Sequence, residues 1–207
     1  MPTPPPPGRW ADLRRALGAH LPGVSAGVPL SELTTFRIGG PVGLLCPVEN
    51  VDQARRFLDF AAARGLPWTC LGGGSNILGD DAGYAGLVLR VRSRRLARRG
   101  EALHVGAGWD LDALVTATLG EGLTGLEFAS GIPGTVGGAL VGNAGCYGRE
   151  IGDLLLEATV LRADGRVQVL GPEDFAFGYR DSALKGRGDM VLELVLEQGA
   201  RMANPGE

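Results

Sequence analysis

Histidine, cysteine and lysine are scarce in this chain, and each shortage argues against a class of function. The 207 residues include two histidines and three cysteines, and the cysteines are far apart and form no CxxC pair. The sequence therefore predicts no metal site and no disulfide framework, and it gives no support to a histidine-dependent triad. Lys185 is the only lysine and the net charge is −3, which argues against nucleic acid as the main partner, because phosphate backbones favour a basic excess.

Long apolar stretches are also missing. No uninterrupted run approaches the ~18 residues that a membrane span requires. The first ten residues, MPTPPPPGRW, are proline-rich and lack the basic-then-apolar order of a secretory signal. We therefore expect no membrane insertion and a cytoplasmic location. The composition, with 44% apolar and 21% charged residues, is typical of a globular fold rather than a disordered chain.

Glycine, in contrast, is abundant, with 35 residues in 207 against a usual share of ~7%. The glycines follow no period, and apolar runs separate them, so the pattern fits neither collagen nor a flexible linker. Ordering a glycine costs more backbone entropy than ordering any other residue. This abundance therefore indicates special backbone conformations or close approach to a ligand.

The apolar pattern predicts an α+β fold with two lobes. Helical spacing between two apolar strands predicts a right-handed βαβ unit, and Asp164-Gly165 marks a hairpin between later strands. The expected strands lie at 44–48, 68–71, 86–91, 102–105, 155–163, 166–170 and 190–197, and the expected helices at 10–17, 51–62 and 111–119, the last one capped by Asp110. The predicted parts are a tail with a short helix (1–29), a βαβ lobe (30–85), a larger and mainly antiparallel lobe (86–199) and a C-terminal tail (200–207).

A first glycine cluster, LGGGSN, runs from Leu71 to Asn76, directly after the second expected strand. A Rossmann fingerprint would instead place its glycines between the first strand and the first helix. Consecutive glycines can direct several backbone N–H groups into one concavity that binds an anion, and Ser75 and Asn76 add side-chain donors. A plain turn between two elements is the alternative interpretation.

A second glycine cluster contains seven glycines between residues 131 and 148. We expect this segment to have too little side-chain bulk to make a core of its own, so that a flat or extended ligand can lie against its backbone. Two such clusters, about sixty residues apart, suggest one ligand held between two lobes. Charge-assisted bonds from backbone amides can anchor a pyrophosphate without any lysine.

Five motifs occur in one order along the chain: TTFRIGG (34–40), LGGGSN (71–76), GLEFASGIPGTVGGA (125–139), NAGCYGREI (143–151) and FGYRDSALK (177–185). Together they closely resemble the MurB family, the UDP-N-acetylenolpyruvoylglucosamine reductases (UDP-N-acetylmuramate dehydrogenases) of peptidoglycan synthesis, over about residues 30–199. The resemblance implies a vanillyl-alcohol-oxidase/PCMH-type FAD-binding fold. It also implies a two-part reaction, in which NADPH reduces FAD and the reduced flavin then passes hydride to UDP-N-acetylenolpyruvoylglucosamine, giving UDP-N-acetylmuramate.

The resemblance also assigns residues. It makes Arg180 the catalytic residue and gives Tyr147, Tyr179 and Arg180 contacts with substrate. Arg37, in the TTFRIGG motif, either braces the cofactor loops, which we expect, or pairs with a carboxylate. Without the family motif, Arg180 would be interpreted as an ordinary ion-pair residue. The arginine-rich stretch 90–99 is interpreted as a solvated hairpin tip. The cofactor-binding residues that the resemblance implies are Leu71, Gly72, Gly73, Gly74, Ser75, Asn76, Gly131, Ile132, Pro133, Gly134, Thr135, Gly137, Gly138, Ala139, Asn143 and Gly145.

The sequence departs from the family in one respect. The family has a further C-terminal substrate domain that opens with a GSxFKNP-like motif, whose serine protonates the intermediate, and that supplies a glutamate. Neither motif occurs here. We therefore expect this chain to be the FAD-binding part and to be deficient in turnover alone. Two alternatives stay open: another PCMH-type flavin oxidoreductase, or a non-catalytic flavin-binding remnant.

Overall fold

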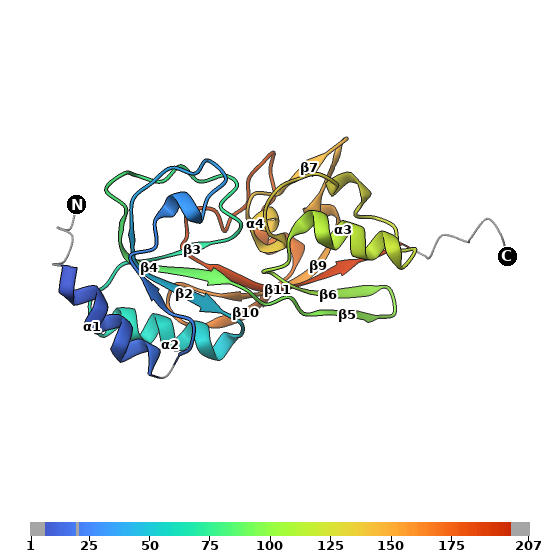
Figure 1. The fold of residues 1–207 in the computed structure, drawn as a ribbon. Helices are drawn as coiled ribbons and strands as arrows, with labels where there is room; N and C mark the ends of the chain where they lie inside the picture. The colour runs from blue at the N-terminus through green and yellow to red at the C-terminus, as the bar shows by residue number, and fades with distance from the viewer. Residues whose placement is uncertain (1–6, 20, 200–207) are drawn as a thin grey trace. The chain divides into compact units, whose positions relative to one another are not determined.

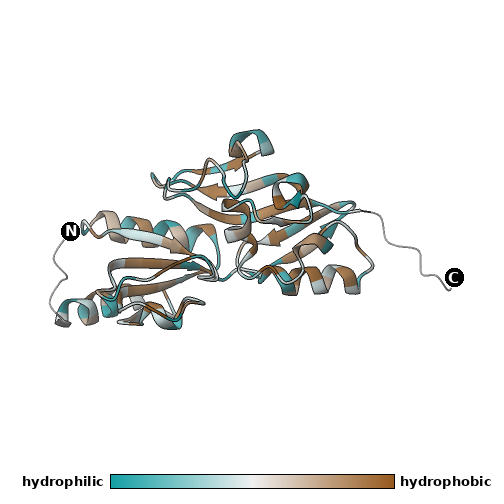
Figure 2. Ribbon diagram, turned by 90° about the horizontal axis from the view of Figure 1, so that it is seen from above, coloured by the Kyte–Doolittle hydropathy of each residue, from teal (hydrophilic) through white to brown (hydrophobic). Residues whose placement is uncertain are grey.

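The computed structural model describes residues 7–19 and 21–199. The chain divides into two compact units, Met1–Val91 and Arg92–Glu207, and Figure 1 shows the elements of each. In both units the sheet strands are predominantly apolar, as the brown colouring in Figure 2 shows. The structure therefore confirms the expected α+β class, with one larger sheet in each unit and a small two-stranded sheet, β7-β8.

The first unit is built on a four-stranded sheet in the order β1-β2-β4-β3, in which only β1 is antiparallel to its neighbour. Helix α2 connects β2 to β3, which confirms the predicted βαβ unit. Asn50 caps α2 by accepting a hydrogen bond from the Gln53 N–H at 2.9 Å. The elements are α1 (Pro7–Gly18), β1 (Ser25–Ala26), η1 (Leu30–Glu32), β2 (Val42–Val48), α2 (Val51–Ala62), β3 (Trp68–Leu71) and β4 (Tyr84–Val91).

Strand β4 changes the expected boundary between the lobes. It lies between β2 and β3 and is parallel to both, although it follows them in the chain. Its central side chains, Leu87 to Leu89, are at most 1% exposed. A strand buried in the middle of a sheet cannot belong to another core, so the first lobe continues to Val91 rather than ending at residue 85.

The second unit contains a five-stranded antiparallel sheet in the order β10-β9-β11-β6-β5. The predicted hairpin joins β9 to β10, and Gly165 takes the left-handed conformation that its turn requires (φ +84°). Asp110 caps α3 as expected, accepting from the Ala113 N–H at 2.9 Å. The main elements are β5 (Leu96–Arg99), β6 (Ala102–Gly106), α3 (Leu111–Gly120), β9 (Leu155–Leu161), β10 (Val167–Leu170) and β11 (Met190–Glu197).

Strand β5 was missed because three of its four residues are exposed and two are arginines, a pattern without an apolar face. It pairs with β6, so Arg98 and Arg99 lie beside the hairpin turn at Gly100. The hairpin-tip interpretation therefore holds for this end of the arginine-rich stretch. Arg90 lies instead in β4 of the first unit.

Short elements occupy the second glycine cluster and its surroundings. Helix α4 lies inside the cluster, and Val136 and Leu140 are fully buried. The helix packs against β6 and β11. The cluster therefore has no core of its own, but apolar residues between its glycines complete the core of the second unit. These elements are η2 (Glu127–Ala129), α4 (Val136–Val141), β7 (Gly145–Cys146), β8 (Arg149–Glu150), η3 (Ile151–Leu154) and η4 (Pro172–Phe175).

Candidate functional site

The first glycine loop, 71–76, rests on the TTFRIGG segment. The backbone N–H and the Oγ1 hydroxyl of Thr35 both donate to the Gly74 carbonyl oxygen, each at 3.1 Å. Gly74 has φ +70°, and a Cβ on it would collide with the Leu33 carbonyl oxygen. Below the loop, Leu30, Leu33 and Leu71 belong to one buried cluster. Only glycine fits at position 74, and the loop is fixed by the Thr35 hydrogen bonds and by the buried leucine cluster.

Two backbone N–H groups at the start of this loop have no acceptor within the described part of the chain. Among the residues that the structure describes, the N–H groups of Gly72 and Gly73 form no hydrogen bond. Both residues are half-buried, and N–H groups in that setting are usually paired with protein or water. Neighbouring unpaired amides on a glycine loop suit an anion such as a diphosphate. The geometry of this loop therefore fits the predicted cofactor contact.

The second glycine cluster behaves differently, because protein acceptors occupy most of its amides. The Gly131 N–H donates to the Asp112 carboxylate at 2.7 Å. The Gly137 N–H donates to the Ala107 carbonyl at 3.0 Å. The other occupied N–H groups belong to Ile132, Gly138 and Ala139. At these five positions the backbone N–H is therefore already bonded to the protein.

Between residues 131 and 139, two N–H groups are left. Within the described part of the chain, the amides of Gly134 and Thr135 have no acceptor, and Pro133 has no N–H to offer. The hydroxyl of Thr135 caps α4 by accepting from the Gly138 N–H at 3.3 Å. An anion at this segment would therefore meet two adjacent amides.

Close packing explains several of these glycines without a ligand. A Cβ on Gly137 would lie 2.7 Å from the Ala107 Cβ, so glycine lets α4 approach the end of β6. A Cβ on Gly145 would collide with the Arg149 carbonyl oxygen in the neighbouring strand β8. At both positions, contact with another part of the protein is enough to require glycine.

Asn143 lies at the end of α4 and is fully buried. Its Nδ2 donates to the Glu150 carboxylate and to the Gly178 carbonyl oxygen, the latter at 3.0 Å, and its Oδ1 accepts from the Gly152 N–H at 3.2 Å. The structure thus surrounds Asn143 with partners from its own unit. The predicted cofactor contact of Asn143 stays a prediction, and its side-chain amide is already bonded within the protein.

Tyr147, Tyr179 and Arg180 come together at two adjacent turns of the second unit. Tyr147 is in the β7–β8 turn, where Tyr147 and Gly148 both have positive φ, the requirement of a type I′ hairpin. In the other turn, Gly178 and Asp181 exchange two backbone hydrogen bonds of 3.1 Å around Tyr179 and Arg180. The Arg180 Nη2 donates to the Gly145 carbonyl oxygen at 2.9 Å and joins the turns.

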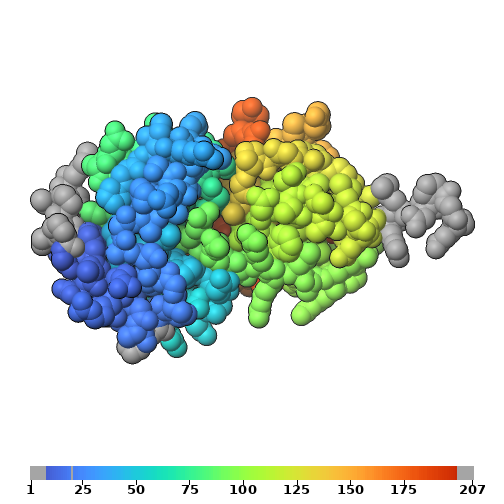
Figure 3. Space-filling view, in the orientation of Figure 1, coloured from blue at the N-terminus to red at the C-terminus, as the bar shows by residue number. Residues whose placement is uncertain are grey.

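Both tyrosines are nearly fully exposed, Tyr147 at 90% and Tyr179 at 89%. In Figure 3 the orange segments of the second unit that carry these turns project from its surface. Large aromatic side chains this exposed are uncommon in a folded unit. The two turns therefore present two rings and one guanidinium to a ligand or another surface.

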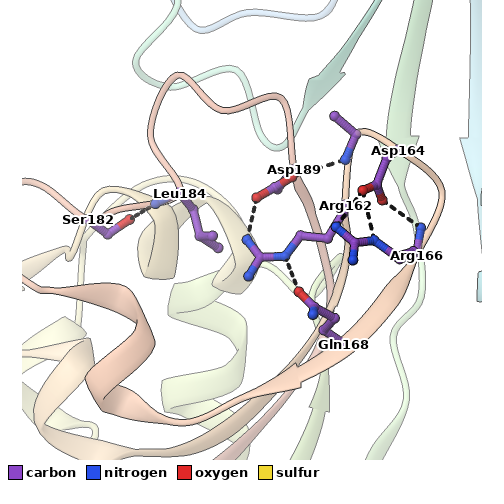
Figure 4. A network of polar contacts seen from close by, with 8 residues as sticks. Arg162, Asp164, Arg166, Gln168, Ser182, Leu184 and Asp189 are labelled. Carbon is purple, nitrogen blue, oxygen red and sulfur yellow. Dashed lines mark hydrogen bonds and ion pairs between the residues drawn. The ribbon is translucent and has the colours of Figure 1, made fainter.

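The loop after Arg180 is fastened at both ends. At its start, the Ser182 hydroxyl donates to the Val141 carbonyl at 2.7 Å. At its end, Asp189 pairs with Arg162 at 2.6 Å, as Figure 4 shows. Arg162 also donates from Nε to Gln168 at 2.6 Å. No pattern in the sequence indicated these partners, because their separations depend on the sheet topology.

Thr35, rather than Arg37, supplies the brace that the sequence placed in the TTFRIGG segment. Among described residues the Arg37 side chain forms no hydrogen bond or ion pair, although its backbone is left-handed (φ +54°). The sequence could have indicated Thr35 for this role, because a threonine hydroxyl and the N–H of the same residue can both donate to one carbonyl oxygen.

No helix in the described residues is long and apolar enough to cross a bilayer.

Comparison with known proteins defines the class. A family model described as an FAD binding domain matches residues 41–171, and the chain belongs to this family. Among solved structures, MurB from Thermus caldophilus superposes with a TM-score of 0.73 and 35% identity, covering 86% of this chain and 63% of that one. Physcomitrella patens BBE-like 1 (TM-score 0.65, 19% identity) shares the fold.

The relatives found by sequence comparison carry the name of one enzyme. The UDP-N-acetylenolpyruvoylglucosamine reductase 2 of Symbiobacterium thermophilum is 42% identical over 170 residues, which cover 81% of this chain and 55% of that protein. The reductase of Bacillus subtilis is 40% identical over 177 residues, covering 84% and 58%. The resemblance to the MurB family is confirmed, with FAD as the cofactor of the matched domain. The chain spans just over half the length of these relatives.

Proposed function

We propose that this chain is the FAD-binding part of a UDP-N-acetylenolpyruvoylglucosamine reductase that uses NADPH as reductant. The observation that carries the proposal is the similarity, at 38–44% identity over about four-fifths of the chain, to proteins of that name. The exposed Arg180 turn supports it, because it offers a fixed cation of the kind that the reaction requires.

For the cofactor, we assign the open amides of Gly72 and Gly73 to the diphosphate. In the second unit, Gly134 and Thr135 offer a separate pair of open amides to an anion. Charge-assisted hydrogen bonds of this kind contribute about 1.5–3 kcal/mol each. FAD, when bound, supplies the two-electron chemistry that carries hydride from NADPH to the enolpyruvyl double bond. The other predicted cofactor residues shape or pack the two segments.

Arg180 has the properties of an electrostatic catalyst. Hydride addition to the terminal carbon of the enolpyruvyl group moves negative charge toward the substrate carboxylate. A planar, permanently charged guanidinium can meet that carboxylate with two parallel N–H groups. Because one Nη is already bonded to the Gly145 oxygen, the fork is oriented before charge develops. The proton that completes the addition is assigned to no residue of this chain.

Tyr147 and Tyr179 stand beside that guanidinium and are proposed to contact the UDP-sugar substrate. Their exposed rings can bury apolar surface against a ligand while each hydroxyl forms a hydrogen bond.

We place the reaction in the cytoplasm. The three cysteines are all free thiols, which is compatible with a reducing compartment.

The proposal is tested by binding first and turnover second. The purified chain is titrated with FAD, and we expect it to become yellow and to quench flavin fluorescence. A colourless protein after incubation with FAD would contradict the proposal. NADPH oxidation is then measured with and without UDP-N-acetylenolpyruvoylglucosamine. We expect little turnover by the chain alone and substrate-dependent turnover when it is fused to the remaining part of the Bacillus subtilis reductase.

Arg180→Ala in that fusion separates FAD binding from substrate reduction. FAD affinity should stay unchanged, whereas substrate reduction should fall by about 10²–10³-fold, because one preorganised donor contributes about 2.7–4 kcal/mol to transition-state stabilisation. Arg187→Ala is the matched control, since Arg187 is exposed and outside the two turns. Normal reduction by Arg180→Ala would remove this residue from the mechanism.

A further inference from the structure

We propose that Asn143 is a positioning residue for the Tyr179–Arg180 turn and not a ligand of the cofactor. The inference depends on the proposed function only in giving that turn a catalytic role. It depends on the structure for the positioning itself, which can be measured without cofactor or substrate.

The hydrogen-bonding capacity of the Asn143 amide is almost fully used. An asparagine side chain has two N–H donors and one carbonyl oxygen. Both donors are engaged, one with the Glu150 carboxylate and one with the Gly178 carbonyl oxygen. The oxygen accepts from the Gly152 N–H at 3.2 Å. Since Asn143 has no exposed surface, it could donate to a cofactor only by releasing one of these partners.

The partners of Asn143 form a closed circuit of contacts, which we call the turn circuit. Asn143 holds the base of the turn through Gly178, and Arg180 at the tip donates to Gly145. Gly145 pairs with Glu150 across the β7–β8 hairpin, and Glu150 accepts from Asn143. Two of these links, Asn143 to Gly178 and Arg180 to Gly145, reach the turn directly, and the contacts of Glu150 connect the residues that make them.

The backbone at Asn143 fits this role. Its φ of +43° is left-handed, a conformation that asparagine tolerates better than most residues. This conformation follows directly after α4, where the chain leaves the helix. In the turn itself, Arg180 is also left-handed (φ +54°). Two unusual backbone positions therefore coincide in one hydrogen-bonded assembly, as expected where a side chain must be held in one direction.

The test measures amide hydrogen exchange in residues 178–181 of the full chain. Asn143→Gly removes the side chain but permits the left-handed backbone. We expect exchange in this segment to become about tenfold faster, because the variant loses three part-buried hydrogen bonds, including the one to the Gly178 oxygen. Exchange in β9 and β11 should not change, because their ladders do not involve Asn143.

Charge rescue distinguishes positioning from general packing. Asn143→Asp places a second carboxylate against Glu150, so we expect faster exchange in 178–181 than in Asn143→Gly. Adding Glu150→Gln removes the repulsion between the two carboxylates, but aspartate at position 143 still has no donor for the Gly178 oxygen, so exchange in 178–181 should return only to about the rate of Asn143→Gly. Asn50→Asp is the matched control. Asn50 only accepts, at the cap of α2, and aspartate caps equally well, so this variant should leave exchange unchanged.

Three results would overturn the proposal. Exchange in 178–181 that is unchanged in Asn143→Gly would show that the turn stands without Asn143. An equal increase throughout the second unit, including β9 and β11, would show that Asn143 has only a general structural role. Weaker FAD binding with wild-type exchange in the turn would make it a cofactor ligand.

A second variant keeps the positioning role testable if Asn143→Gly does not fold. Glu150→Ala removes one partner of the turn circuit and should accelerate exchange in 178–181 by about threefold, again with no change in β9 and β11. If the chain fails to bind FAD at all, the proposed function falls, but the exchange result still decides the positioning role.

Discussion

The two glycine clusters look alike in the sequence and differ in what their backbones do. In the first unit, the N–H groups of Gly72 and Gly73 have no acceptor among the described residues. In the second unit, protein oxygens occupy the N–H groups of Gly131 and Gly137, and the missing side chain at Gly137 lets a helix approach Ala107. Glycine therefore marks a close approach, but the approaching group can be a ligand or the protein itself.

Gly73→Val is the strongest test of this difference. A valine side chain would fill the space above the open amides, so FAD affinity should fall by about 100-fold or more, the loss of roughly two charge-assisted hydrogen bonds. The free energy of unfolding without FAD should change by less than about 1 kcal/mol. Fluorescence titration measures the first quantity and urea denaturation the second. Unchanged FAD affinity would refute the assignment of this loop.

Gly137→Val should have the opposite profile. The added carbons would overlap Ala107 in a filled core, which typically costs about 1–3 kcal/mol of stability. We expect this loss in urea denaturation of the cofactor-free chain. Gly142→Ala is the control, because a Cβ there would make ordinary contact, at 3.6 Å from the nearest atom. Equal stabilities of the two variants would contradict the packing explanation.

Asp112→Ala examines an occupied amide directly. Removing the carboxylate leaves the Gly131 N–H to water and deletes an acid from the first turn of α3. Because the bond is exposed, we expect a loss of about 1 kcal/mol in the free energy of unfolding, measured by urea denaturation. Asp112→Asn keeps an acceptor oxygen and should recover about half of that loss.

Thr35→Val should produce the smallest effect. It removes the hydroxyl that donates to the Gly74 oxygen and keeps the backbone donor. A looser loop should weaken FAD binding by about three- to fivefold, the effect of one neutral hydrogen bond of ~1 kcal/mol. Thr35→Ser retains the hydroxyl and serves as the control. An identical affinity for both variants would show that the brace does not organise the loop.

Most of the fold followed from local patterns. The spacing of apolar residues located α2 and α3, and turn chemistry located the β9–β10 hairpin at Asp164-Gly165. The position of β4 in the middle of the first sheet did not follow, because spatial order in a parallel sheet differs from chain order. Helix α4 was missed because four glycines surround its few buried apolar residues and hide the helical period.

The candidate site was predictable to a lesser extent. Motif resemblance selected the segments, and the structure brings Tyr147, Tyr179 and Arg180 together in one unit. Resemblance could not show which amides point away from protein acceptors, since hydrogen-bond direction depends on partners distant in sequence. The Asp112–Gly131 bond and the three partners of Asn143 are of this kind.

The bond from Arg180 to Gly145 also affects the entropy of ligand capture. An unrestrained arginine side chain samples many rotamers, and stopping that motion costs about 2 kcal/mol. Here one of its five N–H groups is tied to a backbone oxygen, and four stay available to an anion. Much of the rotamer entropy of Arg180 is therefore lost during folding, so a carboxylate that binds later loses less free energy to ordering this side chain.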